Sequence, residues 1–439
     1  MRDIALAAIV VVLLVWALAR PWIGVLTWTW IGLMNPHRLT YGFMFAFPTA
    51  AAVAAVTLLG LLITKERKAP PLTAPVIWLT LLTLHMNFTM FFAWSPAAAW
   101  MQWDKVMKIL LFTYVTMVLI YGREKIRWLM IVTAGSIGFY GAKGGVFTLL
   151  NGGEYRIWGP DGTFIDGNNE IGLAMIMVWP LIVVLASDPS KWIRRPFLAM
   201  AWLTPLSVVF TYSRGALLGL AAVAAPMLLT ARRKWLALLL LIPVGLFAVW
   251  FAPQQLLDRA ETIQTYKQDE SSMQRLQAWG VAWNVAKSYP LTGAGFNLEN
   301  AGNERWLSYA IFLGEWGNRA RAAHSIYFQM LGDHGFVGLG LFLGLLLSCL
   351  LALTRVRRQA SLIEGAQWLA AYANGLRLGL VGFAVSGAFL SLAYFDLFYV
   401  FVAATAVLQR ELRELVRQPR DAMPAMMLAE AGASRRLLQ

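Results

Sequence analysis

The fold is decided by a stretch in which a polar, titratable head runs directly into a long apolar segment. The stretch reads His324-Ser-Ile-Tyr-Phe-Gln-Met-Leu-Gly-Asp-His-Gly335-Phe-Val-Gly338, and the apolar segment continues to about Leu353. A histidine at a membrane boundary can be both hydrated and rigidly held, which suits a proton-transfer group acting on a substrate in the bilayer. Taken alone, a histidine in this position is more often an interfacial residue that only anchors the span.

Composition places the chain among membrane proteins. Of its 439 residues, 59% are hydrophobic and 14% are charged, whereas a soluble protein carries about 25% charged residues. Apolar runs, mostly of about 15 to 23 residues, recur along the chain, as in polytopic helical membrane proteins. The predicted fold class is therefore all-α, an integral membrane protein without a soluble domain of ordinary size.

The single cysteine argues against a protein built on disulfides or on a cysteine-based metal site, and the distribution of the positive charge argues against a nucleic-acid-binding protein. Cys349 lies inside an apolar run, so we expect no disulfide framework and no cysteine-based metal site. The net charge of +14 is concentrated mainly in short loops between the apolar runs, where basic residues set membrane topology. We therefore expect membrane lipids as partners and no binding of nucleic acid.

Basic clusters separated by even numbers of spans predict the orientation of the chain. All of them fall on one side, the cytoplasmic one. If residues 4–34 cross once, as a helix broken at Pro21, about twelve spans result and both ends are cytoplasmic. If residues 4–19 and 23–34 cross separately, there is one span more and the N-terminus is outside. The clusters are Lys65/Arg67/Lys68, Arg123/Lys125/Arg127, Lys191/Arg194/Arg195, Arg232/Arg233/Lys234, Arg355/Arg357/Arg358 and Arg410/Arg413/Arg417/Arg420.

One large loop stands out from this pattern. Residues 253–323 carry equal numbers of basic and acidic residues, which supports their placement outside, in the periplasm if this is a Gram-negative inner-membrane protein. Within this loop, Ser272–Lys287 has helical spacing, and Leu276, Trp279, Val281, Ala282 and Trp283 are expected on the membrane surface. The predicted segments are N-terminal spans at 1–150, an outer loop with central spans at 151–252, the large loop at 253–323, C-terminal spans at 324–409 and a cytoplasmic tail at 410–439.

Motifs for nucleotide and metal chemistry are absent from the sequence. It contains no P-loop, no Gly-rich dinucleotide loop, no HExxH and no D-x-D pair. His324 and His334 lie ten residues apart without an obvious third ligand, so a metal site is not expected. No cofactor is predicted, and the candidate chemistry rests on charged groups of the outer face.

Two arginines and one histidine of this face suggest an anion site beside a proton acceptor. Arg214 stands at the start of a span, and Arg275 lies on the helix expected in the large loop. Arginine grips phosphate oxygens bidentately, so this set suggests binding of a diphosphate next to His324. Each arginine also has a simpler explanation when taken alone. Interfacial snorkelling explains Arg214 equally well, and a solvated surface charge explains Arg275 better.

Other polar residues are candidate substrate-binding or orienting groups. The loop 151–170 combines aromatic surface with amides, as sugar sites do, although ordinary loop composition explains it equally well. Lys143 lies inside a span near its outer end, where a charge is a functional candidate or snorkels to the boundary. Asp396, at a tight outer turn, could orient His324, but a solvated turn residue is the simpler reading. The candidates are Lys105, Lys143, Arg156, Asn168, Asn169 and Asp396.

Three motifs carry a resemblance to a known family. His324-Ser325 is followed by nine residues and then Gly335-Phe-Val-Gly338; Tyr212-Ser-Arg214-Gly stands at a span boundary; Arg275 precedes Pro290-Leu-Thr-Gly293-Ala-Gly295. Together they resemble the O-antigen ligase and Wzy-type polymerase superfamily over roughly residues 165–409. The N-terminal third, with Tyr155-Arg-Ile-Trp-Gly-Pro, looks like its subgroup of O-glycosylation ligases. The resemblance implies a GT-C-like membrane fold.

The resemblance also implies an activity. It is the transfer of a glycan from undecaprenyl diphosphate to a hydroxyl acceptor, usually a sugar of the lipid A-core, at the periplasmic face of the bacterial inner membrane. Such a reaction is metal-independent and inverting. Carried over residue by residue, His324 would be the general base on the acceptor hydroxyl, and Arg214 and Arg275 would bind the diphosphate of the donor.

Several alternatives remain open on the sequence alone. A Wzy-type polymerase, or a ligase with a protein hydroxyl as acceptor, has the same features. A transporter or flippase of lipid-linked sugars predicts charges at the bilayer midplane and an internal repeat, and neither is visible. A sensor or scaffold would not need His and Arg on one face. His334, about 15 Å of helical rise beyond His324, is expected to tolerate replacement much better.

Overall fold

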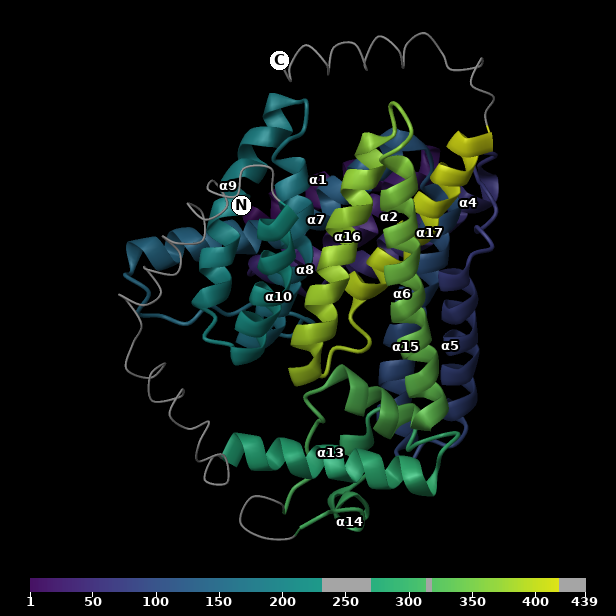
Figure 1. Ribbon diagram of the computed structural model, residues 1–439, viewed down its shortest axis with the longest axis vertical. Helices are drawn as coiled ribbons and strands as arrows, with labels where there is room; N and C mark the ends of the chain where they lie inside the picture. Colours follow the sequence, from purple (N-terminus) through teal and green to yellow (C-terminus); the bar gives the residue numbers. More distant parts are fainter. Residues whose placement is uncertain (231–269, 313–317, 418–439) are drawn as a thin grey trace.

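The computed structural model describes residues 1–230, 270–312 and 318–417. Every regular element within these residues is a helix, which confirms the predicted all-α class (Figure 1). The apolar run 235–252, the basic cluster at 232–234, part of the large loop and the tail beyond 417 lie outside the described residues.

Long helices make up most of the described chain. Among them, α1, α8, α15 and the stretch Gln367–Phe389 are long and apolar enough to cross a membrane. The predicted total of about twelve spans stays a prediction. The long helices are α1 (Arg2–Ala19), α2 (Pro21–Met34), α4 (Thr49–Ile63), α5 (Ala74–Met90), α6 (Pro96–Leu119), α7 (Gly122–Leu150), α8 (Asn168–Leu185), α9 (Lys191–Val209), α10 (Arg214–Thr230), α13 (Glu270–Ser288), α15 (Ile326–Ala360), α16 (Gln367–Ser386) and α17 (Asp396–Arg417). The short elements are η1 (Pro36–Leu39), α3 (Phe43–Ala46), η3 (Leu298–Asn300), α14 (Asn303–Leu307) and η4 (Gly387–Phe389).

Helix α8 lies at the centre of the bundle. It is apolar around its whole circumference, and helices of this kind are buried on all sides. It packs against α7, α9, α10 and α16. Its approach to α16 is close, because a Cβ atom at Gly379 would lie only 2.2 Å from the carbonyl oxygen of Met177. Small residues at such contacts are typical of helix pairs in membranes.

The basic clusters gather at one end of the helices. Lys68, in the loop before α5, forms an ion pair with Glu414 near the end of α17 at 2.7 Å. Arg127, at the start of α7, forms another at 2.7 Å with Asp188, in the loop between α8 and α9. Lys125, also at the start of α7, lies 3.3 Å from the carboxylate of Glu66 in the loop before α5, so the three contacts bring four of the predicted cytoplasmic segments together. We call this the basic end, and the opposite end, where α10 and α15 begin, the site end.

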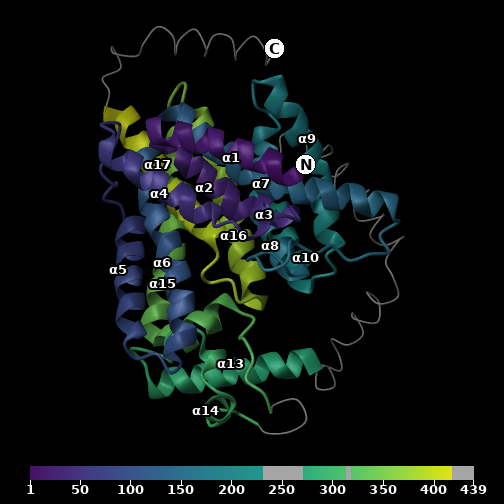
Figure 2. The same cartoon turned by 180° about the vertical axis from the view of Figure 1, so that it is seen from behind.

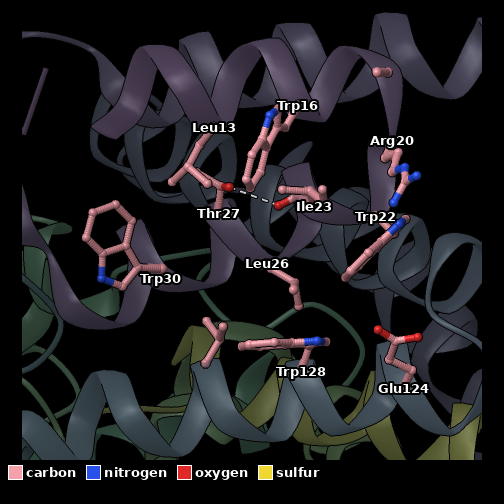
Figure 3. Close-up of a pocket in the computed structure, with 12 residues that line it drawn as sticks. Leu13, Trp16, Arg20, Trp22, Ile23, Leu26, Thr27, Trp30, Glu124 and Trp128 are labelled. Atoms are coloured by element: carbon pink, nitrogen blue, oxygen red, sulfur yellow. Dashed lines mark hydrogen bonds between the residues drawn. The ribbon is translucent and has the colours of Figure 1, made fainter. Parts of the chain in front are cut away.

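The first two helices form a hairpin, which agrees with the second of the two arrangements that the sequence allows and not with a single broken crossing. The chain reverses at Arg20, and α2 runs back along α1 (Figures 2 and 3). At the far end of the hairpin, the Asp3 carboxylate accepts the backbone N–H groups of Gly42 at 3.0 Å and Met44 at 3.1 Å. The proline after Arg20 starts a new helix because its missing N–H costs nothing at that position. The start of α1 therefore lies at the site end, whereas α17 ends at the basic end.

Helix α13 crosses the lower end of α15, with α14 beneath it (Figure 1). The protein itself covers Trp279, Val281 and Ala282, which corrects the expectation that these three side chains lie on the membrane surface. The indole of Trp279 stacks on Phe328 at 4.9 Å and donates a hydrogen bond to the carbonyl of Ala323 at 2.7 Å. Only Leu276 and Trp283 of the five expected residues are exposed. Val281 and Ala282 belong to a small buried core together with Ala278, Val285, Ala294, Leu298 and Trp306.

A kink divides α15 close to the site end. Gly335 has φ 68° and ψ −170°, a conformation that side chains rarely adopt. The loop after α13 fills the gap in the helical hydrogen bonds: the carbonyl of Pro290 accepts the N–H of Phe336 at 2.9 Å. A Cβ atom on Gly293 would lie 2.5 Å from the carbonyl oxygen of Gly332. The glycines of the predicted motifs therefore let the loop and the kink touch through their backbones.

Candidate active site

Five of the predicted polar residues line one pocket at the site end. Arg156, Arg214, Arg275, Asn168 and Asn169 surround a cavity of about 250 Å³. They come from the loop after α7 and from the starts of α8, α10 and α13. Guanidinium groups in such a set suit an anion with several oxygens, and the amides can bond sugar hydroxyls. The remaining lining residues are Tyr212, Ser213, Gly215, Ser272, Phe389 and Leu390.

The loop before α10 fixes the position of Arg214. Tyr212 lies in the left-handed region with φ 55°, and its hydroxyl donates a hydrogen bond to the carbonyl of Gly153. Ser213 caps the helix, because its Oγ accepts the N–H of Ala216 at 3.1 Å. Arg214 is therefore the first residue of α10. The positive end of the helix dipole adds to the field of its guanidinium group.

The amide of Asn168 and a contact with α16 hold the walls of the pocket. Asn168 is buried, and its Nδ2–H donates to the carbonyl of Thr211 at 2.8 Å. The hydroxyl of Ser386, near the end of α16, donates to the carbonyl of Gly215 at 2.9 Å. These bonds join α8, α10 and α16 around Arg214, so the pocket is shaped by helix ends rather than by a loop alone.

His324 lies next to this pocket, just before α15. Its φ of 45° falls in the left-handed region, which costs a non-glycine residue on the order of 1–2 kcal/mol. The backbone N–H of His324 donates to Oγ of Ser391 at 2.8 Å, and its side chain is exposed. Ser391 directly follows Leu390, a wall residue of the arginine pocket. The segment between η4 and α17 therefore connects His324 to the arginines.

The protein around His324 lowers the pKa of this histidine from the ordinary value of 6.5. Desolvation by the neighbouring protein has the largest effect, followed by the positive charges of Arg275 and Arg321. Each cause disfavours the imidazolium form. The ring is consequently neutral at pH 7 and able to accept a proton.

A buried hydrogen-bond network surrounds Asp333 and His334, which follow His324 in the first part of α15. The hydroxyl of Tyr394 donates to Oδ2 of Asp333 at 2.8 Å and lies 2.8 Å from Nε2 of His334. The other ring nitrogen, Nδ1, lies 2.7 Å from Oγ1 of Thr89 on α5. Oδ1 of Asp333 accepts the N–H of Leu298 at 2.9 Å. Asp333, His334, Tyr394 and Thr89 are all buried, so the network fixes the segment that carries Ser391.

This network argues against one prediction and adds residues that the sequence analysis missed. His334 was expected to tolerate replacement, but it is fully buried with partners at both ring nitrogens. Buried polar groups that lose their partners are costly. Asp333 and Tyr394 were not singled out. The signal for Asp333 was present, since a carboxylate close to the start of an apolar run needs a specific partner.

Three predicted residues are not among those that line the pocket. Lys143 is exposed on α7. The ammonium group of Lys105 lies 3.7 Å from the centroid of the Phe164 ring, and its charge interacts with Asp396. The Asp396 carboxylate accepts the N–H of Leu397 at 2.8 Å at the start of α17. Within the described residues, no group of three or more His, Cys, Asp or Glu is arranged to hold a metal ion.

Two family models match the chain. Residues 1–189 match a family of unknown function, DUF5935, and residues 199–343 match the O-antigen ligase family. The second match contains Arg214, Arg275 and His324. Residues 199–343 are therefore an O-antigen ligase domain, which supports membership of the O-antigen ligase superfamily. No curated protein matches the chain.

The O-antigen ligase domain does not contain the whole site. It contributes α10, α13 and the first part of α15, whereas Arg156 and Asn168 come from the segment of unknown function. Ser391 and Tyr394 follow both matched segments. Together with the apolar helices, the domain indicates a helical membrane protein, and the candidate site is assembled from three parts of the chain.

Proposed function

We propose that the chain is a lipid-linked oligosaccharide glycosyltransferase of the O-antigen ligase type. It transfers a glycan from undecaprenyl diphosphate to a hydroxyl acceptor, first of all the lipid A-core, at the periplasmic face of the inner membrane. One observation carries this proposal. Arg156, Arg214 and Arg275 converge on a polar pocket that adjoins His324, and three of these four residues lie in the O-antigen ligase domain.

The arginine pocket binds the diphosphate of the donor. Arg214 and Arg275 grip its oxygens, and the start of α10 adds partial positive charge. As the bond between the anomeric carbon and the diphosphate breaks, negative charge grows on the leaving oxygen. The N–H groups of the arginines are already fixed in place, so they stabilise that charge without reorganisation. Asn168 and Asn169 bond hydroxyls of the glycan next to the diphosphate.

His324 accepts the proton of the acceptor hydroxyl. The hydroxyl oxygen attacks the anomeric carbon from the face opposite the diphosphate, so the configuration inverts and undecaprenyl diphosphate leaves. The proton passes to the imidazole, whose lowered pKa keeps it neutral before the reaction. The reaction is metal-independent, as the family resemblance implies, and the arginines balance the charge of the leaving group.

The identity of the acceptor is tested in reactions that contain purified protein in lipid and an undecaprenyl-diphosphate glycan as donor. Separate reactions contain lipid A-core, a peptide with Ser, Thr and Asn, or the donor alone. We expect glycosylated lipid A-core, lost in the His324→Asn variant. Transfer to the peptide identifies a protein ligase, and lengthening of the donor identifies a Wzy-type polymerase. Donor binding without transfer in all three reactions contradicts the proposed enzyme.

A further inference from the structure

A second cavity lies between α1, α2 and α7, away from the arginine pocket (Figure 3). It encloses about 720 Å³ and lies within the segment that matches the family of unknown function. Four tryptophans contribute to its walls, which is a large share of aromatic surface for one cavity. The lining residues are Leu13, Trp16, Ala19, Arg20, Trp22, Ile23, Leu26, Thr27, Trp30, Glu124, Trp128 and Val132.

The lining of this groove changes from charged to apolar along its length. Figure 3 shows Arg20 and Glu124 at the same side of the groove with Trp22 between them, and Trp30 at the other side. The two charged residues come from the turn between α1 and α2 and from the first turn of α7. Trp128 crosses the floor between the two sides. The groove therefore has a charged mouth and a hydrophobic interior.

The charged mouth lies at the basic end of the bundle. The ammonium group of Lys125 is 5.8 Å from the centroid of the Trp22 ring and 3.3 Å from the carboxylate of Glu66. From this end, α2 carries the lining inward as far as Trp30, about 15 Å of helical rise. The side chain of Trp16 is 57% exposed and that of Trp128 39% exposed. The described protein thus leaves the apolar walls open to the hydrocarbon of a bilayer.

The two charges at the mouth have opposite signs, and the charge of Glu124 also interacts with that of Arg127. Among the described residues, neither Arg20 nor Glu124 takes part in a salt bridge. A ligand that binds both residues must carry an anionic and a cationic group in the same head. Next to an apolar groove at a membrane boundary, an amphiphile with a dipolar head meets this requirement. A lipid head with only negative charge would face repulsion from Glu124.

We propose that this groove is a binding site for an aminophospholipid of the phosphatidylethanolamine class. The lipid phosphate binds the guanidinium of Arg20, and its ammonium group binds the carboxylate of Glu124. One acyl chain lies along Trp16 and Trp128 between α1, α2 and α7. Tryptophan rings favour this depth, because they offer an apolar face beside a polar N–H group.

The test measures lipid retention by native mass spectrometry. The purified full chain is reconstituted with equal amounts of phosphatidylethanolamine and phosphatidylglycerol, then released from the bilayer. We expect retention of the amine lipid to exceed that of the anionic lipid by at least about threefold, the scale of one exposed ion pair. Glu124→Gln should remove this preference, and Arg20→Gln should weaken retention of both lipids. Glu364 and Arg194 are exposed charges at the same end. The matched controls Glu364→Gln and Arg194→Gln should leave both the preference and the retention of the two lipids unchanged.

The location of the lipid is tested separately with a photoactivatable phosphatidylethanolamine. Crosslinks from its acyl chain should map to α1, α2 and the first half of α7, and Val132→Trp, which fills the groove, should remove them. Equal retention of the two lipids by the wild type overturns the proposal. So does a preference that survives in Glu124→Gln, or crosslinks confined to other helices. These readouts do not depend on glycan transfer.

Discussion

The backbone N–H of His324 is bound to the hydroxyl oxygen of Ser391 at 2.8 Å, across 67 residues of sequence. The bond holds a residue that stands in the left-handed region with φ 45°. Ser391 in turn follows Leu390, in the wall of the arginine pocket. The backbone of His324 is thus held beside the pocket by a contact between two segments, and not by α15 alone.

Replacement of His324 tests the proposed general base. His324→Asn is the sharpest variant, because asparagine tolerates a positive φ but cannot accept a proton at neutral pH. We expect transfer to fall by about 10²–10⁴-fold while the lipid-linked donor still binds. Turnover is measured in the purified assay, and donor binding by titration in nanodiscs. A His324→Asn enzyme with wild-type turnover would exclude proton abstraction by this residue.

Replacement of Arg214 or Arg275 tests the diphosphate site. Loss of a charge-assisted hydrogen bond costs about 1.5–3 kcal/mol, so each alanine variant should bind donor about 10- to 150-fold more weakly. Lysine should restore only part of the affinity, because it keeps the charge and loses the bidentate geometry. Arg319→Ala, an exposed arginine that does not line the pocket, is the control. Unchanged donor affinity in both alanine variants would show that the two arginines are only surface charges and do not bind the diphosphate.

The pH dependence of transfer reports on the electrostatics around His324. Only the neutral ring can accept the proton, so kcat/KM should fall as the pH drops through a pKa below the ordinary 6.5. The positive charge of Arg321 helps to lower this pKa. Arg321→Gln should therefore raise the pKa and move the acid limb of the profile to higher pH. Arg319→Gln should leave the limb in place, and an identical shift in both variants would contradict a local effect.

Tyr394→Phe tests the network behind the site. The change removes a hydroxyl that serves two buried groups, Asp333 and His334, so it should destabilise the fold by about 1–3 kcal/mol. Tyr399→Phe is the control, since that buried hydroxyl donates to one carbonyl at 3.2 Å and should cost about 0.5–1.5 kcal/mol. Tm is measured in detergent. The Tyr394→Phe variant should also lose turnover while its affinity for the glycan donor stays unchanged, because Ser391 is then less firmly held. Equal losses of stability and turnover in Tyr394→Phe and Tyr399→Phe would contradict a role of the network in positioning the site.

Labelling of introduced cysteines tests the hairpin at the start of the chain. Tyr41, beside the start of α1, is 87% exposed, and Leu362, at the basic end, is 88% exposed, so both positions are accessible to a reagent. We expect Tyr41→Cys to react from outside intact spheroplasts and Leu362→Cys only after permeabilisation. Cys349 is buried and provides no background. Labelling of both positions from the same side would show that the two ends do not face opposite sides of the membrane.

The gathering of the arginines could be predicted from the sequence. Arg156, Arg214 and Arg275 follow or precede apolar runs whose parity puts all three at the same end, and the structure brings them to one pocket. Parity assigns residues to an end of the bundle but not to a neighbour within it. This is why Asp396 and Lys105, at the same end, were also candidates although neither lines the pocket.

The contacts that position the site could not be predicted in this way. The partners of His334 come from α5 and from the segment before α17, and nothing in local spacing links those segments. The hairpin was ambiguous for a different reason. Helix α2 has 14 residues, or about 21 Å of rise, which is shorter than the roughly 30 Å hydrocarbon core. Residues 4–34 therefore fitted one interrupted crossing as well as two.

The shared network means that the two matched segments are not interchangeable modules. Thr89 belongs to the segment of unknown function, His334 to the O-antigen ligase domain, and Tyr394 to neither, yet they form one chain of buried hydrogen bonds. A chimera whose exchanged segment carries a different residue at one of these positions leaves a hydroxyl or an imidazole without its partner. Hybrids should therefore work only when the exchanged segment keeps the residue that the other two segments require.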